Sequence, residues 1–264
     1  MRGDAGQRSC VRGDHLKIAI GLLAAATATA VVLFLGCQSL QRQTLFYPSH
    51  HSNDNGLERW THGDVLIGFL RPVADPQNIW LMVHGNAGQA SDRVYALARF
   101  SSRDAVYILE YPGYGSRAGK PSREAFDKAA REAYALLRAQ YPGKPVCVAA
   151  ESIGSGPASV LAREPRPPDK LVFLVPFDDL KSVARDHVSS SVPVGTILAG
   201  SWNNVEALGD YTGPMEVFGA ERDQVIPVDH ARRLAASRSQ AKFHLIPGGH
   251  NDWSDQDGVQ IRYP

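Results

Sequence analysis

The sequence predicts an α/β domain built on a mostly parallel central sheet with helices on both faces. Short runs rich in Val, Ile and Leu alternate along the chain with amphipathic segments. Such runs are typical of strands buried on both faces, as in a parallel sheet covered by crossover helices. The length of 264 residues, with 44% hydrophobic and 21% charged residues, suits one domain of this kind with an ample core.

The expected elements follow in chain order from residue 64. The predicted strands are 64–70, 78–85, 105–113, 145–152, 170–177, 215–223 and 242–250. The predicted helices are 92–100, 122–141, 155–164 and 228–238. The long helix has apolar or small residues at helical spacing, so one face is expected to pack on the sheet. Residues 181–212 form one short insertion where a large lid could stand, which predicts a minimal cap and an open site.

The N-terminal region predicts a membrane tether. A modestly positive leader precedes an uncharged apolar run from Ile18 to Gly36. This run suits either a signal peptide or an uncleaved membrane anchor. It ends at Gly36-Cys37, which resembles the lipobox of bacterial lipoproteins and implies lipidation of Cys37. Under both interpretations the domain lies outside the cytoplasm, in the bacterial periplasm or cell envelope.

Composition excludes several classes of partner. The formal net charge is +1 and no basic stripe is interleaved with aromatic residues, so nucleic acid is not an expected partner. Three cysteines, two of them in or beside the apolar run, provide neither a disulfide framework nor zinc spacing. No metal or organic cofactor is predicted.

Polar residues with catalytic potential follow three of the predicted strands. Ser152 ends the strand at 145–152, Asp223 ends the strand at 215–223, and His250 ends the last strand, at 242–250. Functional groups of parallel sheets gather at these strand ends. Ser152 lies between small residues, Ala150 and Gly154, as a strained turn from strand to helix requires. A serine that is activated by a histidine, which an acid orients, is a nucleophile for acyl transfer.

Six motifs along 45–252 resemble those of the α/β-hydrolase superfamily, and more closely its small membrane-associated serine hydrolases with little cap. They are "HGNAG" (84–88), "EYPGYGSRAGKPS" (110–122), "AESIGSG" (150–156), "PFDDL" (176–180), "ERDQVIP" (221–227) and "GGHND" (248–252). The resemblance implies an α/β-hydrolase domain over 56–264, after a signal peptide or anchor (1–36) and a tether (37–55).

The resemblance also assigns roles to individual residues. Ser152 is the expected nucleophile, His250 the base and Asp223 the acid, with Asp178 or Asp179 as the alternative acid. The oxyanion is expected to bind the backbone N–H groups of Ile153 and Asn86. His84 and Glu151 are expected to have structural roles. The order serine, acid, histidine is the one that this superfamily uses.

These assignments predict a serine hydrolase that cleaves a carboxylic ester or thioester, with a small-molecule, lipid or acylated-protein substrate. A peptidase or amidase would use the same triad, because leaving-group preference depends on pocket shape. A catalytically inactive hydrolase fold that acts as a binding module is a further alternative, although no triad residue is missing. An aspartate nucleophile, as in haloalkane dehalogenases, is excluded by Ser152. The oligomeric state is not predicted.

Overall fold

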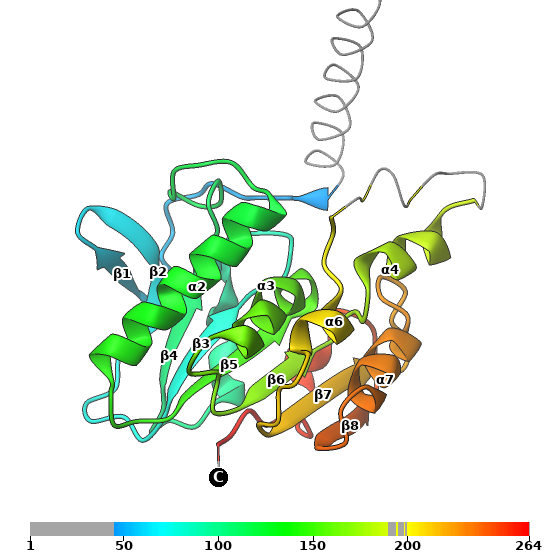
Figure 1. Cartoon of the computed structure of the whole chain (residues 1–264). Helices are drawn as coiled ribbons and strands as arrows, with labels where there is room; N and C mark the ends of the chain where they lie inside the picture. The colour runs from blue at the N-terminus through cyan, green and yellow to red at the C-terminus, as the bar shows by residue number, and fades with distance from the viewer. Residues whose placement is uncertain (1–44, 190–193, 195–197, 199, 264) are drawn as a thin grey trace, which may run out of the picture. The chain divides into compact units, whose positions relative to one another are not determined.

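Eight strands form the central sheet of the described part of the chain (Figure 1). The structure, a computed structural model, describes residues 45–189, 194, 198 and 200–263. The strand order is β1-β2-β4-β3-β5-β6-β7-β8. The strands are β1 (Glu58–His62), β2 (Val65–Arg71), β3 (Ile79–Val83), β4 (Ala105–Leu109), β5 (Val146–Glu151), β6 (Leu171–Leu174), β7 (Met215–Ala220) and β8 (Ala241–Ile246).

The sheet is parallel from β4 to β8, and only β1 and β2 pair in antiparallel fashion with their neighbours. The predicted mostly parallel sheet is therefore confirmed, and each predicted strand corresponds to one observed strand. β1 was not predicted. It pairs only with β2, at the edge of the sheet, and buries the single residue Trp60 of its five.

Helices cover both faces of the sheet, as predicted. The face toward the viewer in Figure 1 carries α2 (Arg123–Gln140), α3 (Ser155–Val160), α6 (Asn204–Leu208) and α7 (Val228–Ala236). On the opposite face lie the 3₁₀ helices η1 (Ala90–Arg99) and η4 (Trp253–Asp255) with the C-terminal segment. The stretch predicted as a minimal cap contains α4 (Leu180–His187) before α6. The short 3₁₀ helices η2 (Ser152–Gly154) and η3 (Leu161–Arg163) flank α3.

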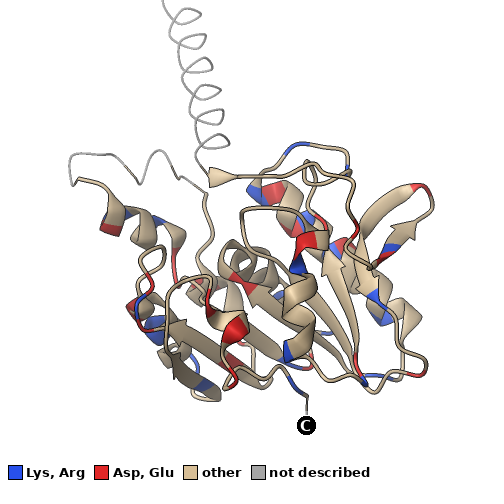
Figure 2. Ribbon diagram, turned by 180° about the vertical axis from the view of Figure 1, so that it is seen from behind, with Lys and Arg blue, Asp and Glu red and all other residues tan. Residues whose placement is uncertain are grey.

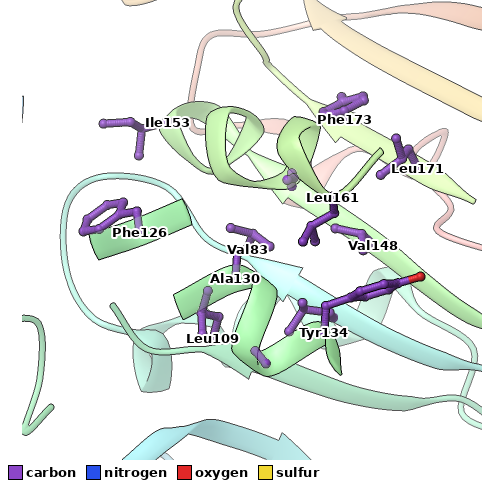
Figure 3. Close-up of a cluster of buried hydrophobic side chains, with 14 of the residues drawn as sticks. Val83, Leu109, Phe126, Ala130, Tyr134, Val148, Ile153, Leu161, Leu171 and Phe173 are labelled. Atoms are coloured by element: carbon purple, nitrogen blue, oxygen red, sulfur yellow. The ribbon is translucent and has the colours of Figure 1, made fainter. Parts of the chain in front are cut away.

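The long helix α2 shows how the sequence builds the larger core. Ser122 caps its first turn by accepting a hydrogen bond from the Ala125 N–H at 3.1 Å, as serine does at helix N-termini. Its buried side chains recur every three or four residues, at Phe126, Ala129, Ala130, Ala133, Tyr134 and Leu137. Figure 3 shows this face against residues of β3, β4, β5 and β6. The small alanines let the helix lie close to the sheet.

The opposite face has its own core. Trp80 of β3 packs edge-on against Phe100, with ring centroids 5.7 Å apart. Trp253 of η4 and Ile261 are fully buried beneath the sheet, and Phe100 forms a bridge with Ile261. In the view of Figure 2, acidic and basic residues are mixed over helices and loops, whereas the strands of the sheet are mostly uncharged.

Much of the predicted N-terminal tether lies outside the described residues. This holds for the signal peptide or anchor (1–36), for Cys37 and for the tether as far as residue 44. From Leu45 onward the chain is described, and Phe46 is buried against Phe126 with ring centroids 5.0 Å apart. Pro48 forms a bridge with Gly88. Within 45–189 and 200–263, no helix has the length and apolarity needed to cross a membrane.

Candidate active site

Ser152 stands on a sharp turn between β5 and α3. Its φ of 52° lies in the left-handed region, which is strained for a residue with a side chain. The turn brings Gly154 so close to the end of β3 that a Cβ there would lie 2.2 Å from the Val83 carbonyl oxygen. A Cβ on Gly156 would collide with the Trp202 ring at 2.5 Å. These contacts explain physically why small residues follow Ser152.

Three side chains form a hydrogen-bonded line at the carboxyl ends of the strands. His250 Nε2 lies 2.9 Å from Ser152 Oγ, and His250 Nδ1 lies 2.7 Å from Asp223 Oδ2. With the ring proton on Nδ1, the imidazole donates to Asp223 and accepts from the Ser152 hydroxyl. The Asp223 side chain is 1% exposed and that of His250 is 10% exposed, so little solvent screens the pair. The structure thus brings together the three residues that the sequence singled out.

Backbone groups hold the two loops that carry Asp223 and His250. Asp223 Oδ1 accepts the N–H groups of Val225 at 2.9 Å and Ile226 at 2.8 Å, which leaves Oδ2 for the histidine. The Arg222 N–H donates to the Gly248 carbonyl at 2.9 Å, joining the loop after β7 to the loop after β8. Gly248 has a φ of +92°, a conformation that glycine adopts without strain.

The alternative acids have other partners. Asp178 accepts from His230 at 2.5 Å and from the Arg233 guanidinium at 2.5 Å. Asp179 caps α4 by accepting the N–H of Lys181 at 2.7 Å. Of the acids weighed from the sequence, Asp223 is the one that lies against His250.

His230 is a fully buried histidine of α7 that contacts the segment after β6. Its Nδ1 faces Asp178 and Arg233, and its Nε2 lies 2.8 Å from Asp186 of α4. Burial opposes charging of the ring and Arg233 adds repulsion, but the hydrogen bonds to the two aspartates outweigh both and raise the pKa of His230. The hydrogen bonds of the His230 ring connect α7 to α4 and to the segment after β6.

This cluster predicts a pH dependence of stability. An unfolded histidine titrates near pH 6.5. Because the pKa of His230 is raised in the folded state, its contribution is complete below about pH 6.5 and is lost as the pH rises through the folded pKa. We expect the free energy of unfolding to fall over that interval, and to fall less in His230→Asn. Urea denaturation at a series of pH values measures this, and parallel curves for the two proteins would contradict it.

The residues expected to form the oxyanion hole lie on two neighbouring turns. Ile153 is in η2, directly after Ser152, and Asn86 lies on the loop after β3. The Asn86 side chain is used structurally: it donates to the Leu45 carbonyl at 2.6 Å and accepts from the Tyr47 N–H at 3.2 Å and the Tyr114 hydroxyl at 3.0 Å. The same loop is bound further along, where the Gly88 N–H donates to the Tyr47 carbonyl at 3.1 Å. These hydrogen bonds attach the segment that begins at Leu45 to the loop after β3.

Asn86→Ala separates the structural hydrogen bonds of the Asn86 side chain from the expected role of its backbone N–H in the oxyanion hole. The variant keeps the backbone N–H but loses three side-chain hydrogen bonds. We expect the free energy of unfolding to fall by about 1–3 kcal/mol, because three partner groups, two of them partly buried, lose their hydrogen bonds. Denaturant unfolding measures this loss, with Tyr114→Phe, which removes one of the three bonds, as the milder comparison. A free energy of unfolding equal to that of the wild type would show that the Asn86 side-chain hydrogen bonds do not contribute to stability.

Beneath the loop lies a polar network that sequence reasoning described only in part. Glu151 was expected to make a structural polar contact, and it accepts the Gly85 N–H at 3.0 Å and the Trp253 indole N–H at 3.2 Å. The partner that was missed is Arg93 of η1, whose Nε lies 3.6 Å from Glu151 Oε2. The sequence signal that could have identified Arg93 is a basic residue on the buried side of the helix predicted over 92–100. His84, predicted to be structural, bonds the Gly85 carbonyl through Nδ1 at 2.7 Å.

Comparison with known proteins finds relatives that match most of this chain. No family model matches it. The uncharacterized protein MT2364 of Mycobacterium tuberculosis is 32% identical over 253 residues, covering 89% of each chain. Lysophosphatidylserine lipase ABHD12 of Rattus norvegicus is 27% identical over 217 residues, covering 73% of this chain and 52% of the lipase. The chain therefore spans about half the length of that lipase.

Solved structures share the fold at low sequence identity. The Pyrococcus furiosus esterase Pf2001 superimposes with a TM-score of 0.58 at 16% identity, covering 79% of this chain and 95% of the esterase. Est1E of Butyrivibrio proteoclasticus, solved with ferulic acid bound, has a TM-score of 0.57 at 15% identity and covers 70% and 88% of the two chains. With the sheet order, the serine turn and the relatives taken together, the chain belongs to the α/β-hydrolase superfamily.

Proposed function

We propose that the protein is a serine hydrolase that cleaves a carboxylic ester or thioester through a covalent acyl-enzyme. The observation that carries the proposal is the continuous hydrogen-bonded line from Ser152 through His250 to Asp223, with distances of 2.9 Å and 2.7 Å. Such a line supplies an activated nucleophile, a base and an orienting acid.

In the proposed acylation step, Ser152 Oγ forms a bond to the substrate carbonyl carbon while its proton passes to His250 Nε2. Asp223 holds the proton on Nδ1, so that Nε2 is free to accept, and stabilises the imidazolium that forms. When the tetrahedral intermediate collapses, the bond to the leaving oxygen or sulfur breaks and the imidazolium returns the proton to that atom. The products of this step are the free alcohol or thiol and an acyl ester on Ser152.

Deacylation follows the same path with water as the nucleophile. His250 accepts a proton from water, and the hydroxide forms a bond to the acyl carbon. The bond to Ser152 Oγ then breaks, and the proton returns to Oγ with release of the carboxylic acid. In both steps the N–H groups of Ile153 and Asn86 are assigned to the developing oxyanion, where preorganised donors contribute most to the rate.

A lipid or other acyl ester is the proposed substrate class. The mammalian and other vertebrate relatives bear the name lysophosphatidylserine lipase, and their similarity covers most of this chain. Val225 is 52% exposed two residues after Asp223, and Val188 is 40% exposed at the end of α4. His187 binds the Val225 carbonyl at 2.9 Å and joins these two apolar positions. They offer an apolar rim of the kind that an acyl chain contacts.

A matched substrate panel tests the proposal. We expect hydrolysis of p-nitrophenyl esters of graded chain length and of acyl-CoA thioesters, with little hydrolysis of the corresponding p-nitroanilides. Anilide hydrolysis at a comparable rate would support an amidase with the same triad. Absence of turnover on every acyl substrate, with saturable binding of them, would support an inactive binding module and overturn the proposal.

We further propose that a lipid on Cys37 tethers the domain outside the cytoplasm. The uncharged run from Ile18 to Gly36, with positive charge before it and Gly36-Cys37 at its end, motivates this. Each buried methylene contributes about 0.8 kcal/mol, and two or more chains are needed for stable anchoring. An uncleaved helix would anchor the domain equally well.

Processing distinguishes the two tethers. In a bacterial host we expect the mature chain to begin at Cys37 and to carry palmitate label, and Cys37→Ser to lose both cleavage and label. A protein that keeps Met1, with Cys37 unmodified, would mean a signal anchor instead. Membrane fractionation alone cannot separate these outcomes.

A further inference from the structure

A buried ion pair lies directly under the loop that follows β3. Glu151 is the residue before Ser152, and its side chain is 8% exposed; the side chain of Arg93 is 11% exposed. Burial opposes ionisation of Glu151, but the Arg93 guanidinium and the Gly85 N–H hold the pKa of this carboxyl below its usual value. Both groups are therefore charged at neutral pH. A buried pair of this kind is costly to form, so its position needs an explanation.

The pair binds one edge of the loop. Glu151 accepts the Gly85 N–H at 3.0 Å. Arg93 Nη2 donates to the Ala87 carbonyl and lies 3.4 Å from the Gly85 carbonyl oxygen. A Cβ on Gly85 would lie 3.0 Å from the Glu151 carboxyl carbon, so any larger residue at this position would crowd the carboxylate.

These contacts set the direction of the next N–H group. In a trans peptide the C=O and the following N–H point in opposite directions. Because the Gly85 carbonyl faces Arg93 and the His84 ring, the Asn86 N–H points away from them. Across 45–189 and 200–263, this N–H and that of Ala87 have no hydrogen-bond acceptor, whereas the Gly85 and Gly88 N–H groups are both bonded. The Asn86 N–H is thus left available on the side opposite the ion pair.

We propose that Arg93 and Glu151 are positioning residues, which act by holding the Asn86 N–H toward the oxyanion of the tetrahedral intermediate. The inference rests on the proposed serine-hydrolase function. Neither side chain touches the substrate in this account. Glu151 holds the His84–Gly85 peptide through its N–H, and Arg93 holds the carbonyl groups of Gly85 and Ala87. Since Glu151 also adjoins Ser152 in sequence, one buried pair links the nucleophile to the donor loop.

Arg93→Lys and Glu151→Gln test the role with small changes of shape. Lysine keeps the charge beside Glu151 but lacks the planar fork that reaches two carbonyl groups. Glutamine keeps an acceptor but loses the charge that holds Arg93. Arg99→Lys is the matched control, because Arg99 also lies on η1 and also donates to a backbone carbonyl, that of Gln256 at 2.9 Å.

The readouts are the kcat and KM of p-nitrophenyl butyrate hydrolysis and the inhibition constant of a medium-chain alkyl trifluoromethyl ketone, whose adduct with serine carries an oxyanion. For Arg93→Lys and Glu151→Gln we expect kcat to fall by about 10²-fold with KM little changed, as for a displaced oxyanion donor. Ketone affinity should weaken by the same factor as kcat/KM. Arg99→Lys should match the wild type in both measurements.

Thermal melting establishes that each variant is folded, and Arg93→Lys, which keeps both charges, decides the outcome if Glu151→Gln does not fold. An unchanged kcat and ketone affinity in folded Arg93→Lys would overturn the inference. So would equal losses in Arg99→Lys, which would indicate a general effect of η1. A wild type that hydrolyses no ester would instead reject the proposed function, so the two failures can be told apart.

Discussion

Ser152→Ala should abolish ester hydrolysis and fluorophosphonate labelling while leaving the fold intact. Without Oγ no acyl bond can form at this position, and we expect kcat to fall by on the order of 10⁴–10⁶-fold. Alanine retains the Cβ of serine, so the turn at φ 52° keeps the same strain and stability should change by less than about 1 kcal/mol.

The measurement pairs initial rates on p-nitrophenyl esters with gel detection of the labelled protein. His244→Gln is a suitable control, since His244 lies in β8 beside Glu216 and outside the proposed line. Persistent labelling or hydrolysis in folded Ser152→Ala would assign the nucleophile to another residue.

Asp223→Asn should lower kcat by about 10⁴-fold. In serine triads, an amide in place of the acid stabilises the tautomer of histidine that cannot act as the base. An asparagine Oδ1 can still accept the N–H groups of Val225 and Ile226, which fixes its Nδ2 on the side of His250. That Nδ2 donates to Nδ1, so the ring proton moves to Nε2 and the ring can no longer accept the Ser152 proton.

Asp179→Asn is the matched control for this prediction. Asp179 caps α4, and asparagine caps a helix as well as aspartate does, so turnover and stability should stay close to those of the wild type. Steady-state kinetics on both variants, with thermal melting as a check of folding, measure the difference. A larger loss in Asp179→Asn than in Asp223→Asn would reassign the acid.

The strands could be predicted because a sheet buried on both faces requires nearly continuous apolar runs. β3, β4, β5 and β6 are buried at every residue, and each was predicted within a few residues of its observed bounds. β1 was missed for the opposite reason: Glu58, Arg59 and His62 are exposed at the sheet edge, and only Trp60 packs inward. Its strand conformation depends on pairing with β2, a tertiary contact that local sequence does not reveal.

Helices of the cap region depend in the same way on contacts from elsewhere in the chain. α4 begins where the Asp179 side chain caps it, and α6 begins where Asn203 accepts the Glu206 N–H at 3.0 Å. Asn204 is fully buried and donates to Ser155 and to the Phe177 carbonyl, at 2.9 Å and 2.8 Å. From the sequence alone, a polar stretch of this kind is predicted to be irregular, because its helices depend on contacts with distant residues.

In the candidate site, too, some residues could be predicted from the sequence and others could not. Ser152, Asp223 and His250 could be singled out because each follows a predicted strand, and parallel strands deliver their carboxyl ends to one edge of the sheet. The pairing of Arg93 with Glu151 could not be predicted. Arg93 precedes Glu151 by 58 positions, and the direction of the Arg93 side chain depends on how η1 packs on the sheet. The ends of the predicted strands locate the candidate catalytic residues, whereas the contacts of Arg93 and Glu151 with the loop after β3 are evident only in the packed structure.

The most direct test of the central claim is to trap the acyl-enzyme. Wild-type protein is mixed with p-nitrophenyl butyrate, quenched in acid during turnover and digested, and its peptides are analysed by mass spectrometry. The account predicts a burst of p-nitrophenol and a butyryl group on Ser152, absent from Ser152→Ala. Turnover without a burst and without any acyl peptide, or a butyryl group on a different residue that Ser152→Ala retains, would contradict it.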